Sequence, residues 1–288
     1  MAGTVRAYYQ LTKPGVLYGN VLTAAAGFLL AARGHIDLWL FIATIVGMTL
    51  VIAAACVLNN HLDQDIDRIM ARTKSRPSVT GEVKGSYMVS YAMILLILGI
   101  VTLALGTNWL VVWIGIIGFV TYVWLYGALS KRRSIHGTLV GSVSGAMPII
   151  GGYGAVSGQV DAGLIIVFLI LFFWQFPEFY SIAIYRRKEY AAAKIPVMSV
   201  VKGVRSTTIQ IFLYTILYVL STLALTILGY TGYIYFVIMT FLGGYWIWLG
   251  YQGLHTKDSD AWARRMFKFS MITILALCVM LSIGPLLP

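Results

Sequence analysis

The fold is decided by residues 38–60, which read LWLFIATIVGMTLVIAAACVLNN and contain no charged side chain. About 20 apolar residues in a helix cross the roughly 30 Å hydrocarbon core of a bilayer. Further apolar runs of this length lie near 14–33, 87–106, 109–129, 138–157, 162–184, 207–229, 231–253 and 267–287. The sequence therefore predicts an all-α polytopic membrane protein, with about nine transmembrane helices in one bundle and a single domain over residues 1–288.

The composition excludes the soluble classes of protein. Hydrophobic residues make up 59% of the 288 residues and charged residues only 11%, whereas a soluble domain has about 25% charged residues. We therefore expect no nucleic-acid partner despite the net charge of +11, and we expect the lipid bilayer as the surroundings. Cys56 and Cys278 lie inside apolar runs, so no disulfide framework is indicated.

The basic residues predict the topology. With nine spans, the amino terminus and the loops after the even-numbered spans share one side, and 20 of the 21 Lys and Arg residues fall there. Only Arg33 lies opposite. Because short cytoplasmic loops are enriched in Lys and Arg, we expect a cytoplasmic amino terminus, a periplasmic carboxyl terminus and a bacterial cytoplasmic (inner) membrane. No cleavable signal peptide fits the segment before Pro14.

Acidic residues gather at the inner end of the 38–60 span. If the helix continues, Asn59, Asp63 and Asp67 lie within about an 80° arc on one face, and Asp65 points elsewhere. Two carboxylates and an amide oxygen suit Mg²⁺, which commonly binds one or two carboxylates together with substrate phosphates.

Three cations follow this group within nine residues: Arg72, Lys74 and Arg76. Fixed cations beside a carboxylate pair favour a polyanionic ligand. The alternative is a solvated, charged helix end with local salt bridges, and the spacing leaves both interpretations open.

A second polar cluster follows the 162–184 span. A carboxylate such as Glu178 in an apolar span is costly and therefore a candidate functional group. Pro177 can open the helix there. In one unbroken helix Glu178 and Glu189 would be about 16 Å apart, so they could not share an ion. The alternative interpretation is an interfacial Glu178 that pairs with Arg186.

Two other patterns have more than one interpretation. Glycines recur at Gly137, Gly141 and Gly145, which favours close helix packing over a wall against a flat ligand. The run Lys131-Arg132-Arg133 is either part of a binding site or simply cytoplasmic positive charge.

The acidic motif resembles the first aspartate-rich motif of the intramembrane prenyltransferase superfamily. The match runs from Asn59-x3-Asp63-x3-Asp67 to Arg76-Pro77, and its particular version resembles the branch that farnesylates haem. Further stretches agree in the same order along the chain: 12–15 with Asn20, 131–148, 174–203 and 262–264.

The resemblance implies a Mg²⁺-dependent transfer of the farnesyl group of farnesyl diphosphate to a vinyl group of haem B. The products are haem O and diphosphate, and the reaction passes through an allylic carbocation. Haem O serves terminal oxidases, so their assembly machinery is a candidate partner.

The resemblance also implies site residues. Asn59, Asp63, Asp67 and Glu178 are the expected metal ligands, and Asn59, Asp63, Asp67 and Arg72 the expected catalytic group. The expected substrate contacts are Lys74, Arg76, Lys131, Arg132, Gln175, Glu178, Tyr185, Arg186, Glu189, Lys194 and Lys202.

The chain departs from the family pattern at three positions. Glu178 stands where His is common, Glu189 replaces Asp and Ser199 replaces Pro. Glu178 either supplies an acidic metal ligand or alters a haem contact, and the sequence leaves both open.

Two alternative functions fit the sequence less well. A prenyltransferase for an aromatic quinone precursor shares the chemistry, but the stretches 12–15 and 196–203 argue against it. A transporter or haem-handling scaffold should place carboxylates near mid-span, whereas Asp63 and Asp67 lie at one end of a span.

Overall fold

The computed structural model describes residues 2–288, and this part of the chain forms helices and no strand. Nine of its helical segments are long and apolar enough to cross a membrane, as predicted. They are α2 (Pro14–Ala32), α3 (Leu38–Leu62), α6 (Gly85–Gly106), α7 with η1 and α8 (Trp109–Val120, Thr121–Ser130, Lys131–Arg133), α9 (Gly137–Ser157), α10 (Ala162–Tyr185), α13 (Gly203–Ile227), α14 (Tyr233–Gly253) and α15 with η2 (Ser259–Ile283, Gly284–Leu286).

Some of these helices extend beyond the predicted apolar runs. The last one begins at Ser259 rather than near residue 267, because its first two turns are polar and apolar runs mark only the part within the membrane. The Asp258 carboxylate caps this polar start by accepting a hydrogen bond from the backbone N–H of Ala261 at 3.0 Å.

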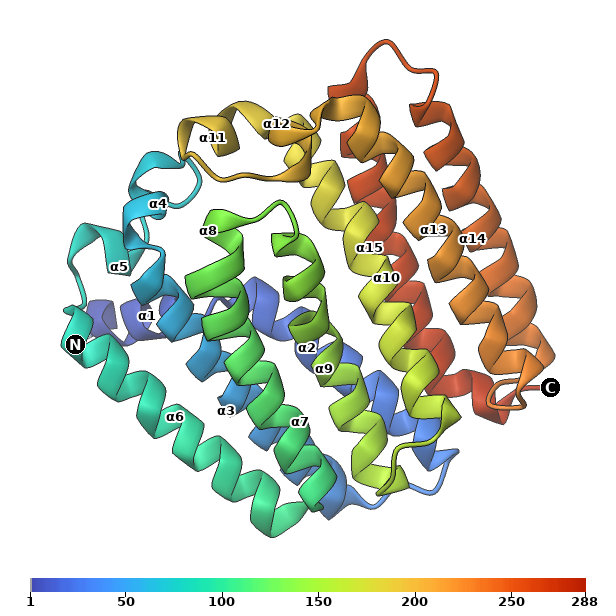
Figure 1. Ribbon diagram of the computed structural model, residues 1–288. Helices are drawn as coiled ribbons and strands as arrows, with labels where there is room; N and C mark the ends of the chain where they lie inside the picture. Colours follow the sequence, from blue (N-terminus) through green and yellow to red (C-terminus); the bar gives the residue numbers. More distant parts are fainter. Residues whose placement is uncertain (1) are drawn as a thin grey trace.

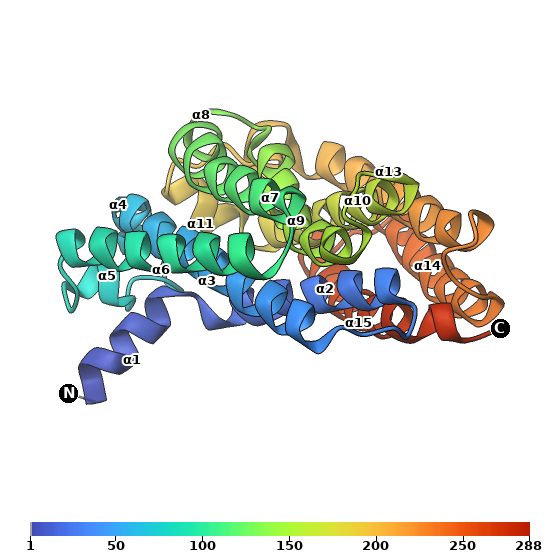
Figure 2. The ribbon, with the colours of Figure 1, turned by 90° about the horizontal axis from the view of Figure 1, so that it is seen from below.

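Short helices complete the fold: α1 (Ala2–Leu11), α4 (Gln64–Ile69), α5 (Pro77–Thr80), α11 (Arg187–Ala192) and α12 (Met198–Val201). Figure 1 shows α4, α5, α8, α11 and α12 above the ends of the long helices, and Figure 2 shows the bundle from below.

The loops after α3, α8, α10 and α14 meet at one end of the bundle, which we call the basic end. Lys131 after η1 pairs with Asp63 after α3. Apolar contacts join Ile66 to the segment after α10. Arg187 of α11 lies 3.9 Å from Asp260 at the start of α15. These contacts confirm that the predicted alternation of spans gathers the basic loops together.

The other loops meet at the opposite end. The Arg33 guanidinium donates to the carbonyl oxygen of Gly229 at 3.2 Å, which joins the loop after α2 to the loop after α13. The Asn108 amide donates to the carbonyl oxygen of Gly154 at 2.9 Å, which joins the loop after α6 to the end of α9. Arg33, the one basic residue predicted away from the others, therefore lies at this end.

Helices α2 and α9 cross in close contact. A Cβ atom added at Gly152 would lie 1.8 Å from the carbonyl oxygen of Ala24, and one added at Gly27 would lie 2.1 Å from that of Ile149. Only glycine permits this approach of two backbones. The predicted glycines also pack closely, but mainly against side chains: a Cβ atom added at Gly145 would lie 1.9 Å from Gln175 Oε1, and one added at Gly141 would lie 3.1 Å from the Tyr126 ring. Close packing at these positions is confirmed, and the backbone contact at Gly152 was not predicted.

Candidate functional site

The acidic motif lies where α3 gives way to α4. The shared face of the motif was predicted on the condition that the helix continues, and the chain instead turns at Asp63 (φ −92°, ψ 6°) between Leu62 and Gln64. The backbone N–H of Asp63 nevertheless donates to the Asn59 carbonyl at 3.0 Å, and that of Asp67 donates to the Asp63 carbonyl at 2.8 Å. The one-turn spacing is thereby kept.

Burial separates the three motif residues from their acidic neighbour. Asn59, Asp63 and Asp67 are each at most 4% exposed, whereas the Asp65 side chain is 67% exposed. The prediction that Asp65 points away from the other two carboxylates is confirmed. The Arg132 guanidinium holds Asp65 through two contacts of 2.7 Å and lowers the pKa of its carboxyl to about 2.

Each buried carboxylate is paired with a cation, Asp63 with one from another span and Asp67 with one nine positions further along the chain. The Lys131 ammonium lies 2.5 Å from Asp63 Oδ2. The Arg76 guanidinium lies 2.6 Å from Asp67 Oδ2 and also donates to Asn60 Oδ1 at 3.2 Å. Arg132 is 3.8 Å from the other oxygen of Asp63. The structure thus brings together five of the predicted site residues.

Lys13 is a further member of this group that was not among the predicted site residues. Its ammonium donates to Asn59 Oδ1, and its backbone is left-handed (φ 53°) directly before Pro14. Burial lowers the pKa of Lys13 to about 8. The sequence places Lys13 in the stretch 12–15, which agrees with the family pattern, but this stretch gives no indication of its partner.

The span that carries Lys131 approaches the site as a π-helical segment, η1. π-Helical turns are rare in proteins, and many of those that occur lie at functional sites. The Tyr122 hydroxyl lies 3.5 Å from Asn59 Oδ1, and the Lys131 ammonium is 5.9 Å from the centre of the Tyr126 ring. The two tyrosine rings stack with their centres 5.8 Å apart. The two rings therefore line one side of the cluster formed by Asn59, Asp63 and Lys131. The sequence did not predict this arrangement.

The residues present fit a Mg²⁺ ion bound together with a polyanion. Within the described residues, Asp63 Oδ1 is buried and accepts no hydrogen bond, although Arg132 lies 3.8 Å away. A buried oxygen without a hydrogen bond is unfavourable. Lys13, Arg76 and Lys131 carry three positive charges against the two buried carboxylates. The excess of positive charge favours an anionic ligand.

The second polar cluster has a different arrangement. The Gln175 amide donates to the carbonyl oxygens of Ser142 and Leu171 at 3.0 and 2.9 Å, so Gln175 ties α10 to α9. Helix α10 continues through Pro177 without a break. Among the described residues, Glu178 is partly buried and has no hydrogen-bond or ion-pair partner.

The alternative pairing of Glu178 with Arg186 does not occur, because Arg186 pairs with Glu189 at 3.0 Å. No three His, Cys, Asp or Glu side chains within residues 2–288 are grouped as a metal site. Glu178 therefore does not complete a three-carboxylate site with Asp63 and Asp67, and its role as a metal ligand stays a prediction.

The remaining predicted residues lie around the rim of the basic end. Tyr185 lies beside Arg186 and Arg264. Four basic residues are exposed and make no ion pair within the described part of the chain: Arg72, Lys74, Lys194 and Lys202.

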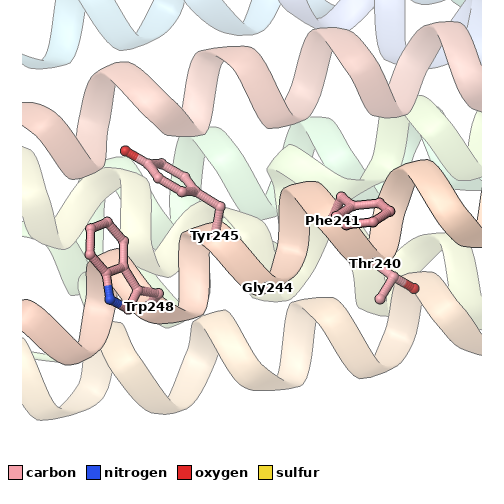
Figure 3. A pocket seen from close by; sticks show the side chains of 5 residues that line it. All are labelled: Thr240, Phe241, Gly244, Tyr245 and Trp248. Carbon is pink, nitrogen blue, oxygen red and sulfur yellow. The ribbon is translucent and has the colours of Figure 1, made fainter.

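The surface also has a shallow depression on α14, away from these charges (Figure 3). It is lined by Thr240, Phe241, Gly244, Tyr245 and Trp248 and contains no charged side chain. Its apolar lining suits a lipid acyl chain, so we do not place the functional site there.

A helical membrane bundle with buried carboxylates among cations at one end is the arrangement of an intramembrane enzyme for a polyanionic substrate. The chain belongs to the UbiA prenyltransferase family, whose sequence model matches residues 20–272. It is therefore a multi-pass membrane prenyltransferase, which decides against the transporter and scaffold alternatives.

Two relatives named protoheme IX farnesyltransferase are similar over nearly the whole chain. The protein from Yersinia enterocolitica is 46% identical over 279 residues, which cover 97% of this chain and 94% of the relative. The protein from Photorhabdus laumondii is 46% identical over 284 residues, which cover 99% and 97%.

Solved structures share the fold at low sequence identity. A structure described for digeranylgeranylglyceryl phosphate synthase has a TM-score of 0.83 and 19% identity, and the match covers 98% of this chain and 99% of that one. A UbiA homologue from Archaeoglobus fulgidus, bound to DMAPP and Mg²⁺, has a TM-score of 0.71 and 16% identity, with coverage of 96% and 99%.

Proposed function

We propose that the protein transfers the farnesyl group of farnesyl diphosphate to a vinyl group of protohaem IX, which is haem B. The names of the relatives at 46% identity support this donor and this acceptor. The observation that carries the chemistry is Asp63 Oδ1, which is buried among cations and accepts no hydrogen bond from the described residues. This arrangement supports the binding of a polyanion together with a divalent cation.

Asp63 and Asp67, with Asn59, would hold Mg²⁺. When bound, the ion supplies positive charge that stabilises the departing diphosphate. The Archaeoglobus homologue, which is bound to both DMAPP and Mg²⁺, supports this assignment.

Lys13, Arg76 and Lys131 neutralise the charge that develops on the diphosphate oxygens as the C–O bond of the donor breaks. Fixed cations in a partly buried site act strongly, because they need no reorientation during the reaction. Arg72 and Lys74, which are exposed beside the motif, attract the polyanion to the basic end.

The aromatic rings of Tyr122 and Tyr126 lie next to these cations and shield the reacting carbon from water. Their π faces also favour the positive charge of the allylic cation. The vinyl π electrons of protohaem then form the new C–C bond, which leaves a cation on the carbon next to the macrocycle. Water adds to this carbon and loses a proton, giving the hydroxyethylfarnesyl group.

We propose that the whole chain acts as one catalytic unit in a bacterial cytoplasmic membrane, with the basic end in the cytosol. The one-sided distribution of Lys and Arg supports this orientation. Haem O made there would pass to the terminal oxidase assembly machinery.

A comparison of acceptors tests the proposal. Purified protein with Mg²⁺ and farnesyl diphosphate is given either protohaem IX or 4-hydroxybenzoate, and diphosphate release is measured. We expect diphosphate release in the incubation with protohaem IX and none in the incubation with 4-hydroxybenzoate. Release with 4-hydroxybenzoate alone would assign the protein to quinone-precursor chemistry, and release with neither would contradict the assigned acceptors.

A further inference from the structure

A second cationic group lies at the basic end, where α10 meets α15, two helices that run side by side in Figure 1. Two guanidinium groups lie over the Tyr185 ring. The central carbon of Arg264, from α15, is 4.6 Å from the ring centre, and that of Arg186 is 5.7 Å away. Phe267 contacts the ring edge from α15 at 6.2 Å between centres.

Both guanidinium groups keep hydrogen-bond donors free. Arg264 makes no ion pair and no hydrogen bond within residues 2–288. Arg186 contacts Glu189 through Nη1 alone. A guanidinium beside an aromatic ring still presents its N–H groups to a planar carboxylate. Tyr185 therefore positions two guanidinium groups, that of Arg186 at the end of α10 and that of Arg264 from α15.

This arginine pair lies close to the site assigned to the donor. Tyr190 of α11 is the connecting residue, because it packs against the apolar cluster of Ile66 and Met70, and Ile66 stands directly before Asp67 of the acidic motif. The backbone N–H of Tyr190 donates to the Arg186 carbonyl oxygen at 3.2 Å, and Arg186 belongs to the pair on Tyr185. The arginine pair is thus joined through Tyr190 to the segment that carries Asp67.

Glu178 lies on the same face of α10 as Tyr185 and further from the basic end. It precedes Tyr185 by seven residues, which places both within about 20° on one face of α10 and about 10 Å apart along its axis. Glu178 is partly buried and has no cationic partner in the described chain, so the cations on this face of α10 are at the arginine end. Anionic groups are therefore attracted to the arginine end.

We infer that Arg186 and Arg264, held on the Tyr185 ring, bind the two propionate carboxylates of the tetrapyrrole acceptor. The inference rests on the proposed function, because the acceptor must be a dicarboxylic tetrapyrrole. Propionates and vinyl groups occupy opposite edges of protohaem IX. Binding by the arginine pair turns the vinyl edge away from the rim and into the bundle.

The experiment compares protohaem IX with its dimethyl ester, in which both carboxylates are capped. Binding of each compound to detergent-solubilised protein is measured by absorbance titration without donor. Binding of farnesyl diphosphate is measured separately as a test of folding. The variants are Arg264→Gln and Arg186→Gln. The matched control is Arg187→Gln, since Arg187 lies 3.9 Å from Asp260 and is not one of the two guanidinium groups over the ring.

The unmodified protein should bind the diacid at least about tenfold more tightly than the diester. Each of the two variants should lose most of this preference and keep its affinity for the donor, while Arg187→Gln should keep both. A diacid preference that persists in Arg264→Gln and Arg186→Gln would overturn the inference.

Two other outcomes separate this inference from the proposed function. Equal binding of diacid and diester by the unmodified protein would overturn the propionate site and leave protohaem as the acceptor. Binding of neither compound by a protein that still binds farnesyl diphosphate would overturn both.

Discussion

The Lys131 ammonium lies 2.5 Å from Asp63 Oδ2, although the two residues are 68 positions apart in the sequence. They come from the ends of two different spans, and the Asp63 side chain is only 1% exposed. A carboxylate so buried needs a cationic partner. This ion pair joins the acidic motif after α3 to the basic run Lys131-Arg132-Arg133 at the end of the fourth span. The proposed donor site is therefore formed by tertiary packing.

Replacing Asp63 by Asn should reduce turnover by at least about 100-fold, the order expected when one preorganised electrostatic contact is removed. The shape of the side chain is kept, so the fold should be retained. Diphosphate release and the melting temperature in detergent check the two statements. An Asp63→Asn variant with most of its activity would remove Asp63 from the metal site.

The Asp67→Asn variant should lose turnover to a similar extent, because Asp67 is the second buried carboxylate of the motif. Asp65→Asn is the matched control two residues away. The Asp65 side chain is exposed and its ion pair with Arg132 is screened by solvent, so activity should stay within about threefold. Equal losses in both variants would contradict the distinction between buried and exposed carboxylates.

Changing Lys13 to Asn should weaken donor binding and leave the fold intact or more stable. The change removes a buried cation, so the KM for farnesyl diphosphate should rise about tenfold or more. Burial lowers the pKa of Lys13 to about 8, so at pH 7 the charged form is held in an unfavourable environment. Asn also tolerates the left-handed backbone at this position.

Steady-state kinetics and thermal unfolding at pH 7 measure both effects of the Lys13 change. The control is Lys257→Asn, at an exposed loop position. An unchanged KM for the donor in the Lys13 variant would exclude Lys13 from the diphosphate site.

The Glu178→His change tests the acidic residue at which this chain departs from the family pattern. Glu178 is not grouped with Asp63 and Asp67 in the described structure, so we expect an unchanged Mg²⁺ concentration dependence and an altered KM for protohaem. Activity lost at low Mg²⁺ and restored at high Mg²⁺ would instead assign Glu178 to the metal.

Helix packing gives a prediction about stability. In a Gly152→Ala variant the added methyl group would meet the Ala24 carbonyl at 1.8 Å, so α2 and α9 must move apart. Overpacking of this kind typically costs about 1–3 kcal/mol. Gly19→Ala on α2 is the matched control, since nothing lies within 4 Å of its added Cβ. Equal melting temperatures for the two variants would contradict the close crossing.

The nine spans could be predicted because each apolar run is long enough to cross a bilayer and the loops alternate in charge. The break at Asp63 could not, since Asn59, Asp63 and Asp67 keep their one-turn spacing on both sides of it. Carboxylates and cations near the motif were also predictable from their order along the chain.

The partners in the site depend on tertiary contacts and were therefore not predictable. Lys13 reaches Asn59 from another helix, and Arg264 reaches Tyr185 across 79 positions of sequence. The π-helical form of 121–130 has no local sequence signal, because its residues also suit an ordinary transmembrane helix. Sequence patterns thus identify which residue types gather at the basic end, and the structure identifies their pairs.

The most direct test of the proposed function is one incubation of purified protein with haem B and farnesyl diphosphate, in the presence of Mg²⁺ or EDTA. The haem is then extracted and its mass measured. We predict a farnesylated, hydrated haem that forms with Mg²⁺ and is absent with EDTA. Unmodified haem under both conditions, from a folded protein that binds the donor, would contradict the proposed haem farnesylation.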